Sequence, residues 1–116
     1  MAYMLLVVER VGDRAAQSES ELRSRYDRMV SFSEDLKRRG LLTMSQSLKT
    51  DTLARVTTRG EKPIVHDGPF AEAKEMIGGL LLLTCDIREQ ATEVARECPA
   101  AEWATIEVRE LGPCFM

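Results

Sequence analysis

Four stretches of the chain have the apolar patterns of β-strands. Residues 2–8 and 80–84 are nearly continuous apolar runs, which is typical of strands buried on both faces. Residues 41–48 and 104–109 instead alternate apolar and polar side chains, which predicts strands with one exposed face. The pattern therefore predicts a sheet of at least four strands.

Two helices are expected between these strands. Ser18 and Glu21 form the Ser-x-x-Glu pattern of a helix N-terminus, and Gly40 follows the helix that begins there. Its apolar face carries side chains that we expect mainly in the core: Leu22, Tyr26, Met29, Val30 and Leu36. A second helix is expected to have Asp86 as its N-cap and to end before Pro99. Its apolar face consists of Ile87, Ala91, Val94, Ala95 and Cys98.

The middle of the chain predicts a hairpin followed by an unusual turn. Residues 53–58 and 63–66 flank a loop that contains Gly60, which favours a β-hairpin. The sequence Asp-Gly-Pro at 67–69 then signals a turn, in which Gly68 can take backbone angles closed to other residues. Pro69 suits the first position of a short helix, so we expect a turn or two of helix over residues 69–76.

The order of these elements predicts the fold class. Strand, helix, strand, hairpin, strand, helix and strand correspond to an α+β protein, a ferredoxin-like βαββαβ sandwich with an inserted β-hairpin. Both helices would cover one face of an antiparallel sheet. The other face would be bare, and a second copy of the chain could cover it, which favours a homodimer. A pocket between the sheet and the hairpin loop would then follow.

Composition narrows the function classes. A length of 116 residues fits a single domain over residues 1–116. The net charge of −3 comes without a basic stripe, so we expect no nucleic-acid partner. The apolar start is too short for a signal peptide or a membrane span, so we expect a cytoplasmic protein with no membrane partner. Three cysteines without a Cys-x-x-Cys pair, and a single histidine, predict neither a metal site nor a disulfide framework. With no cofactor motif present, we expect no cofactor.

The residues around the turn resemble a known family. Residues 67–72, followed by Lys74, Glu75 and the glycine pair 78–79, are similar to the DGPF motif of the YCII-related proteins, bacterial members of the dimeric α/β barrel group. Residues 3–6, 98–100 and 106–109 also resemble that family, so the likeness covers nearly the whole chain. The resemblance implies a ferredoxin-like homodimer. Some DGPF proteins are encoded beside sigma factors, which implies a regulatory context as one alternative.

Candidate site residues lie in the same segment. Asp67 is the main candidate for catalysis, because a nearby helix N-terminus favours a carboxylate, whereas burial would make it a general base. His66 is a weaker candidate, since neighbours on an extended segment point to opposite faces. Two adjacent glycines, Gly78 and Gly79, leave the backbone bare for close approach of a ligand or of another strand. The expected substrate-binding residues are Gly68, Pro69, Phe70, Lys74, Glu75 and Gly79.

Two function classes remain open at this point. The first is a small enzyme that performs isomerase, lyase or hydrolase-like acid/base chemistry on a small organic acid at Asp67. The second is a non-catalytic dimeric module that binds a small ligand or a protein partner, with Asp67 as a structural turn cap. A pocket with convergent polar groups around Asp67 would favour the first class.

Overall fold

The computed structural model describes residues 2–68, 70 and 73–115 of the chain. It contains a four-stranded antiparallel sheet, a separate two-stranded hairpin, two α-helices and two short 3₁₀ helices. In chain order the elements are β1 (Tyr3–Arg10), η1 (Arg14–Ala16), α1 (Glu19–Arg38), β2 (Leu42–Ser47), β3 (Ala54–Arg59), β4 (Lys62–Asp67), β5 (Glu75–Leu83), α2 (Arg88–Glu97), η2 (Pro99–Glu102) and β6 (Thr105–Glu110).

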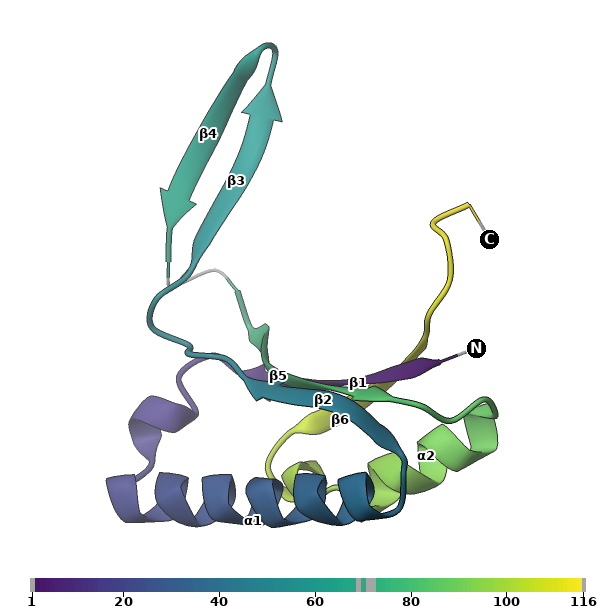
Figure 1. Cartoon of the computed structure of the whole chain (residues 1–116). Helices are drawn as coiled ribbons and strands as arrows, with labels where there is room; N and C mark the ends of the chain where they lie inside the picture. Colours follow the sequence, from purple (N-terminus) through teal and green to yellow (C-terminus); the bar gives the residue numbers. More distant parts are fainter. Residues whose placement is uncertain (1, 69, 71–72, 116) are drawn as a thin grey trace.

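The sheet has the strand order β2-β5-β1-β6, and each neighbouring pair is antiparallel. Both α-helices cover one face of this sheet, as Figure 1 shows. The hairpin β3–β4 is inserted between β2 and β5 and projects from the opposite side of the sheet (Figure 1). This is the ferredoxin-like βαββαβ arrangement with an inserted hairpin, so the predicted fold class is confirmed.

The core lies between the sheet and the helices. Alternate residues of β1 and β5 point toward the helices because side chains alternate along a strand. The most deeply buried side chains are Leu5, Leu36, Leu81, Leu83 and Val94. Burying each of these stabilises the fold by roughly 1.5–3 kcal/mol. Cys85 and Cys98 are also buried in this core, and for Cys98 this agrees with its place on the apolar face of the second helix.

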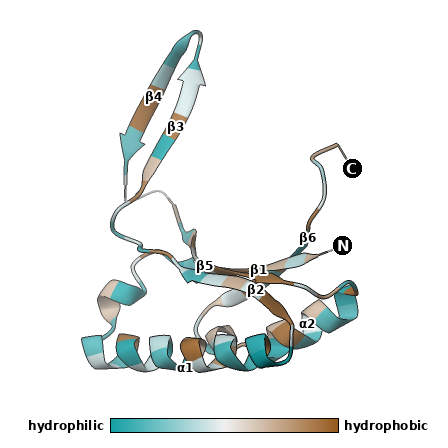
Figure 2. Ribbon diagram, in the orientation of Figure 1, coloured by the Kyte–Doolittle hydropathy of each residue, from teal (hydrophilic) through white to brown (hydrophobic). Residues whose placement is uncertain are grey.

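The opposite face of the sheet also carries apolar side chains. We call this side the outer face. Its apolar side chains come from alternate residues of the strands: Met4, Leu6, Val8, Met44, Ile77, Leu80 and Leu82. Figure 2 shows the hydrophobic colouring along β1 and β5. Met44 is 46% exposed. The hairpin stands on the same side of the sheet, so it rises beside this apolar surface (Figure 1).

Helix α1 begins and ends as predicted. The Ser18 hydroxyl accepts a hydrogen bond from the Glu21 backbone N–H at 3.1 Å, which is an N-cap. Gly40 has a φ of 72° just after the helix, a conformation that favours glycine. Within the described ranges, neither this helix nor any other combines the length and apolarity needed to cross a membrane.

Three predictions about local structure are wrong. The expected helix over residues 69–76 is not formed at its end, because Glu75 and Met76 already belong to β5. Within the described part of that segment, the Ala73 N–H donates to the Phe70 carbonyl at 3.1 Å. Helix α2 begins one residue later than expected, so Ile87 rather than Asp86 is its N-cap.

The third error concerns the apolar face of α1. Tyr26 was expected in the core but is 60% exposed, and Val30 is also exposed. Spacing places both residues on the side of α1 that faces the sheet, but the strand opposite them carries small polar side chains. The space that a core would fill is therefore left open.

Candidate functional site

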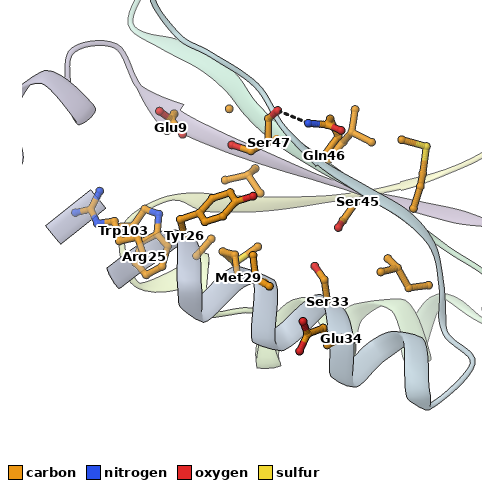
Figure 3. A pocket seen from close by; sticks show the side chains of 18 of the residues that line it. Glu9, Arg25, Tyr26, Met29, Ser33, Glu34, Ser45, Gln46, Ser47 and Trp103 are labelled. Carbon is orange, nitrogen blue, oxygen red and sulfur yellow. Dashed lines mark hydrogen bonds between the residues drawn. The ribbon is translucent and has the colours of Figure 1, made fainter. Parts of the chain in front are cut away.

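A cavity of about 650 Å³ lies between α1 and the adjacent part of the sheet. Its apolar lining comes from the sheet, from α1 and from the segment after α2: Val7, Leu22, Tyr26, Met29, Val30, Leu42, Ala100 and Trp103. Its polar lining includes hydroxyl groups of α1 and β2 and a few charged side chains. Figure 3 shows the space between the helix and the strands, with side chains from both pointing into it.

Small polar residues on β2 explain why this space is not filled. The pairing of β2 with β5 shifts between Leu42 and Met44, so the predicted alternation changes side there. After the shift, Ser45 and Ser47 stand opposite Leu81 and Gly79 and share their face, toward α1. A serine fills much less volume than the leucine or valine typical of a core strand.

The hydroxyl groups of the cavity come from both walls. In Figure 3, Ser33 of α1 and Ser45 of β2 point toward one another across the space. Tyr26 extends from α1 toward the sheet in the same view. Ser47 lies further along β2, next to Gln46, whose amide donates to the Ser47 carbonyl at 3.0 Å. These groups can donate and accept hydrogen bonds with an occupant.

One end of the cavity holds an ion pair whose carboxylate is buried. Glu9, at 5% exposed, continues the inward-facing side of β1. Arg14 Nε lies 2.8 Å from Glu9 Oε1, and Arg14 Nη2 lies 3.1 Å from Glu9 Oε2. The same guanidinium donates to the carbonyls of Gly78 at 2.9 Å and Leu48 at 2.6 Å. Arg14 therefore joins β1, β5 and the end of β2, and it neutralises a carboxylate that would be costly to bury alone.

The glycine pair has two different structural roles. A Cβ added to Gly78 would lie 2.5 Å from Glu9 Cδ and 2.7 Å from Arg14 Nη2, so any side chain at this position would force the ion pair to shift. A Cβ on Gly79 would lie 3.2 Å from the Gln46 carbonyl of β2 and would project beside Val7. The backbone of the glycine pair was expected to allow close approach of a ligand or a strand. At Gly78 the group that comes close is the Glu9–Arg14 ion pair, and at Gly79 it is the neighbouring strand β2. Gly79 also lines the cavity.

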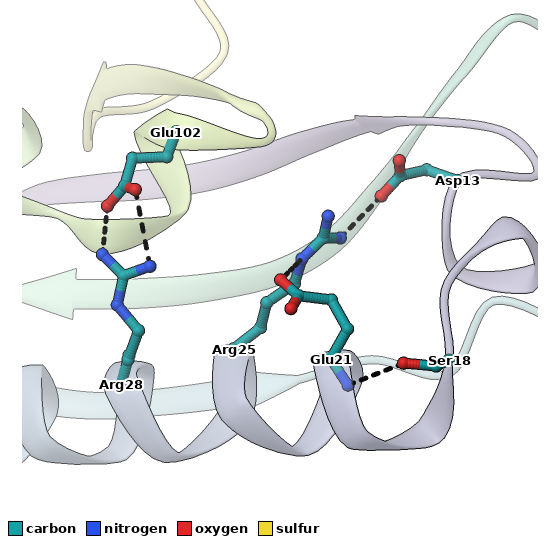
Figure 4. A network of polar contacts seen from close by, with 6 residues as sticks. All are labelled: Asp13, Ser18, Glu21, Arg25, Arg28 and Glu102. Carbon is teal, nitrogen blue, oxygen red and sulfur yellow. Dashed lines mark hydrogen bonds and ion pairs between the residues drawn. The ribbon is translucent and has the colours of Figure 1, made fainter.

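A cation–aromatic cluster forms one wall of the cavity. The guanidinium carbons of Arg25 and Arg28 lie 5.0 Å and 5.4 Å from the ring centroid of Trp103. Arg25 Nη1 also bonds to Asp13 Oδ2 at 2.8 Å, and Arg28 forms an ion pair with Glu102 (Figure 4). These contacts attach the loop after β1 and the helix η2 to α1. They hold Trp103 in place at the edge of the cavity.

The predicted catalytic residues lie elsewhere. Asp67 is the last residue of β4, is exposed, and pairs with Ala54 across the hairpin. His66 is also exposed and pairs with Arg55. As expected for neighbours on a strand, the two side chains point to opposite faces. Both belong to the projecting hairpin, and the cavity lies among α1, β2 and β5, on the helix-covered side of the sheet.

The remaining residues of the predicted site make local contacts. Gly68 does not have a positive φ; its N–H bonds to the Leu53 carbonyl at 2.7 Å, and an added Cβ would meet the side chains of Leu53 and Phe70. The Phe70 ring lies 4.2 Å from the guanidinium carbon of Arg55. The predicted role of Gly68, a special backbone conformation, is therefore wrong, and close packing replaces it.

Two further predicted residues follow this turn, and one lies outside the described residues. Lys74 is exposed, and its carbonyl accepts from the Val11 N–H at 3.0 Å. Glu75 is exposed at the start of β5, opposite Arg10. Pro69 lies outside the described residues. Among the predicted site residues that the structure describes, Gly79 alone lines the cavity.

The model of one protein family matches residues 1–114, and its description is YCII-related domain. The chain belongs to the YCII-related family. A search of curated proteins gave no match. The match extends over the sheet, both helices and the hairpin, in agreement with the resemblance carried by the DGPF segment.

Sequence reasoning missed most of the cavity of this YCII-related chain. Glu9 and Arg14 flank the end of an apolar run and were not singled out, because nothing in the sequence marks them as partners. Ser45 and Ser47 were assigned to an exposed face. The sequence does contain one signal for this space. Serines stand at alternate positions of one predicted strand, and a glycine pair precedes another. Small residues on two adjacent strands can leave space between the sheet and a helix.

The cysteines of this YCII-related chain do not contribute a nucleophile to the cavity lining. Burial raises the pKa of the Cys85 and Cys98 thiols, so both remain protonated at neutral pH. Cys98 Sγ lies 3.8 Å from Met29 Sδ within the core. Cys114 is exposed in the C-terminal tail.

Proposed function

We propose that this protein is a small-molecule-binding module and that the cavity between α1 and the sheet is its binding site. This is the second of the two function classes that the sequence leaves open. The observation that carries the proposal is the cavity itself. Its volume of about 650 Å³ falls in the range of about 300–1,000 Å³ that is typical of ligand sites. Its lining is apolar with a few polar groups, which is also typical of such sites.

Acid/base chemistry at Asp67 has less support. A general base usually lies in a site that excludes water and brings other polar groups within hydrogen-bond reach of a substrate. Asp67 is exposed on the projecting hairpin, and its strand neighbour His66 points to the other face. The carboxylate in the cavity is instead Glu9, both of whose oxygens already accept from Arg14. Enzyme activity at Asp67 stays a prediction.

We also propose that the module is a homodimer formed through the outer face. Support comes from the apolar residues of that face, which include the exposed Met44 and Ile77. The hairpin adds to it, because Val56 and Val65, which pair across β3 and β4, are each 62% exposed. A two-stranded hairpin is at best marginally stable alone in water. A second copy stacked on the outer face would cover both surfaces.

Binding can be tested with two uncharged probes, benzyl alcohol and indole. We expect each to shift the backbone amide resonances of the cavity residues in ¹H–¹⁵N spectra, and to leave those of the hairpin unchanged. Trp103 is the single tryptophan of the chain and lines the cavity, so its fluorescence gives a second measurement.

A pair of variants locates the binding site. Ser33→Phe fills the cavity from α1 and should abolish the shifts. Ser31→Phe makes the same substitution on the same helix at an exposed position outside the cavity lining, and should leave them intact. Shifts that survive in Ser33→Phe, or that concentrate at the hairpin, would contradict the proposed site.

A further inference from the structure

We infer that the natural ligand of this cavity is an uncharged ring compound that carries hydroxyl or carbonyl groups. The inference rests on the proposed function and specifies its ligand. It follows from the arrangement of the charges, hydroxyl groups and apolar groups of the cavity.

The charges of the ion pair at one end are matched to each other. Both oxygens of Glu9 accept from Arg14, and two further N–H groups of Arg14 reach the Leu48 and Gly78 carbonyls. A ligand cation would therefore compete with Arg14 for Glu9. A ligand anion would find the guanidinium committed to three other acceptor groups. Neither a cationic nor an anionic ligand would therefore find an unpaired opposite charge at Glu9 or Arg14.

The other interior cation is also engaged. Arg25 Nη1 bonds to Asp13 Oδ2 at 2.8 Å, and the guanidinium covers the Trp103 ring. Its buried Nε lies 3.5 Å from Glu21 Oε1 and makes no hydrogen bond to the described residues. Two further charged residues of the lining, Glu34 and Lys37, are exposed and have opposite signs three residues apart on α1. Because both side chains are exposed and hydrated, they offer a charged ligand only a weak, screened interaction.

The remaining polar groups suit a neutral ligand. Ser33, Ser45, Ser47 and Tyr26 can each act as donor or acceptor, which fits hydroxyl and carbonyl groups equally well. In Figure 3, Tyr26, Ser33, Ser45 and Ser47 lie between Glu9 at one end and Glu34 at the other.

The apolar groups of the cavity suit a ring. Val7 and Met29 offer aliphatic and thioether surface, and Trp103 and Tyr26 offer aromatic surface. Gly79 carries no side chain, so strand backbone forms part of the lining beside Val7. A ring can pack against such a surface more completely than a flexible chain, and it loses less conformational entropy on binding.

Three probes with one ring and different charges test the inference: 2-naphthalenemethanol, 2-naphthoate and 2-naphthylmethylammonium. Affinity is measured for each by calorimetry at pH 7, and the site is located by ¹H–¹⁵N spectra. We expect the alcohol to bind at least about tenfold more tightly than either ion. If 2-naphthoate or the ammonium binds as tightly as the alcohol or more tightly, this inference is overturned while the proposed function stands.

The hydroxyl groups are tested with the double variant Ser33→Ala and Ser45→Ala. It should weaken binding of the alcohol by about fivefold, because a neutral hydrogen bond is lost, and leave 2-methylnaphthalene binding unchanged. An equal loss for both probes would contradict the role of the hydroxyl groups. If none of the probes shifts the resonances of the cavity residues, the proposed function fails together with the inference.

Discussion

The buried carboxylate of Glu9 forms an ion pair with Arg14, with 2.8 Å between Glu9 Oε1 and Arg14 Nε. The two residues belong to different elements, since Glu9 ends the buried part of β1 and Arg14 begins η1. The pair occupies the space that a side chain at position 78 would need. The glycine at position 78 of the DGPF-type segment is therefore explained by its contact with Glu9, about seventy residues earlier in the chain.

Substitution of Gly78 tests this relationship. We expect Gly78→Ala to lower the free energy of unfolding by about 2 kcal/mol, because the added methyl group overlaps the Glu9 carboxylate. Urea unfolding at one fixed protein concentration measures the change.

A double-mutant cycle gives the control. In a Glu9→Ala background the overlap is absent and the Arg14 side chain can move aside, so Gly78→Ala should then cost less than about 0.5 kcal/mol. If the cost is the same in both backgrounds, the glycine is required for another reason than the ion pair.

Asp67 is expected to contribute little to stability. Because its side chain is exposed at the end of β4, Asp67→Ala should change the free energy of unfolding by less than about 0.5 kcal/mol. Asp13→Ala serves as a comparison and should cost about 1 kcal/mol, because Asp13 pairs with the half-buried Arg25. A loss of about 1 kcal/mol or more for Asp67→Ala would instead support a structural turn cap.

The proposed homodimer can be tested at Met44. This residue lies on the outer face and is exposed in a single chain, so Met44→Glu should fold normally. It would place a charge in an apolar interface, and we expect the molar mass measured by light scattering to fall from that of a dimer to that of a monomer. Ser31→Glu, on the exposed side of α1, should leave the mass unchanged. Equal masses for wild type and Met44→Glu would exclude this interface.

Asp35 gives the chain a pH-dependent contribution to stability. Hydrogen bonds from Arg38 and Arg39 lower the pKa of the Asp35 carboxyl below its ordinary value. A lowered pKa in the folded state contributes stability above the ordinary value of about 4, and this is lost as pH falls through the lowered pKa. We therefore expect Asp35→Asn to be less stable than wild type at pH 7, and the difference to shrink as the pH falls below about 4.

High salt provides a control for the ion pairs of Asp35. Since the Asp35 pairs lie on the surface, about 1 M salt at pH 7 should also reduce the difference between Asp35→Asn and wild type. A difference in stability that is constant with pH would show that the substitution acts through packing instead.

The three cysteines should differ in reactivity. Burial raises the pKa of Cys85 and Cys98, whereas Cys114 is exposed, and the thiolate is the reactive form. With an aromatic disulfide reagent at pH 7, one thiol per chain should react quickly in the native protein and all three in urea. The fast reaction should disappear in Cys114→Ser. A second fast thiol in the native protein would mean that one of the buried cysteines is accessible.

The fold was predictable because its signals are local. Ser18 and Gly40 mark the ends of α1, and these signals act within one helical turn. The hairpin around Gly60 formed as predicted, with a φ of 64° at that residue. The start of β5 was misplaced because Pro69 and Gly68 suggest a short helix locally, whereas pairing with β1 extends the strand back to Glu75.

The site was not predictable in the same way. Asp67 stood out because its segment has an unusual composition, but an unusual composition does not say which residues from distant segments lie beside it. Ser45 faces α1 because of one pairing shift near Thr43, and a shift of one residue moves every later side chain to the other face.

The sequence by itself determined the order of elements, the main core positions and the membership in the YCII-related family, because helix caps, turn residues and apolar spacing act over a few residues. Only the tertiary structure decided that Glu9 meets Arg14 at Gly78, and that serines of β2 leave a cavity against α1. These features depend on strand register and on the volumes of side chains that are far apart in the chain. Neither quantity can be read from a local pattern.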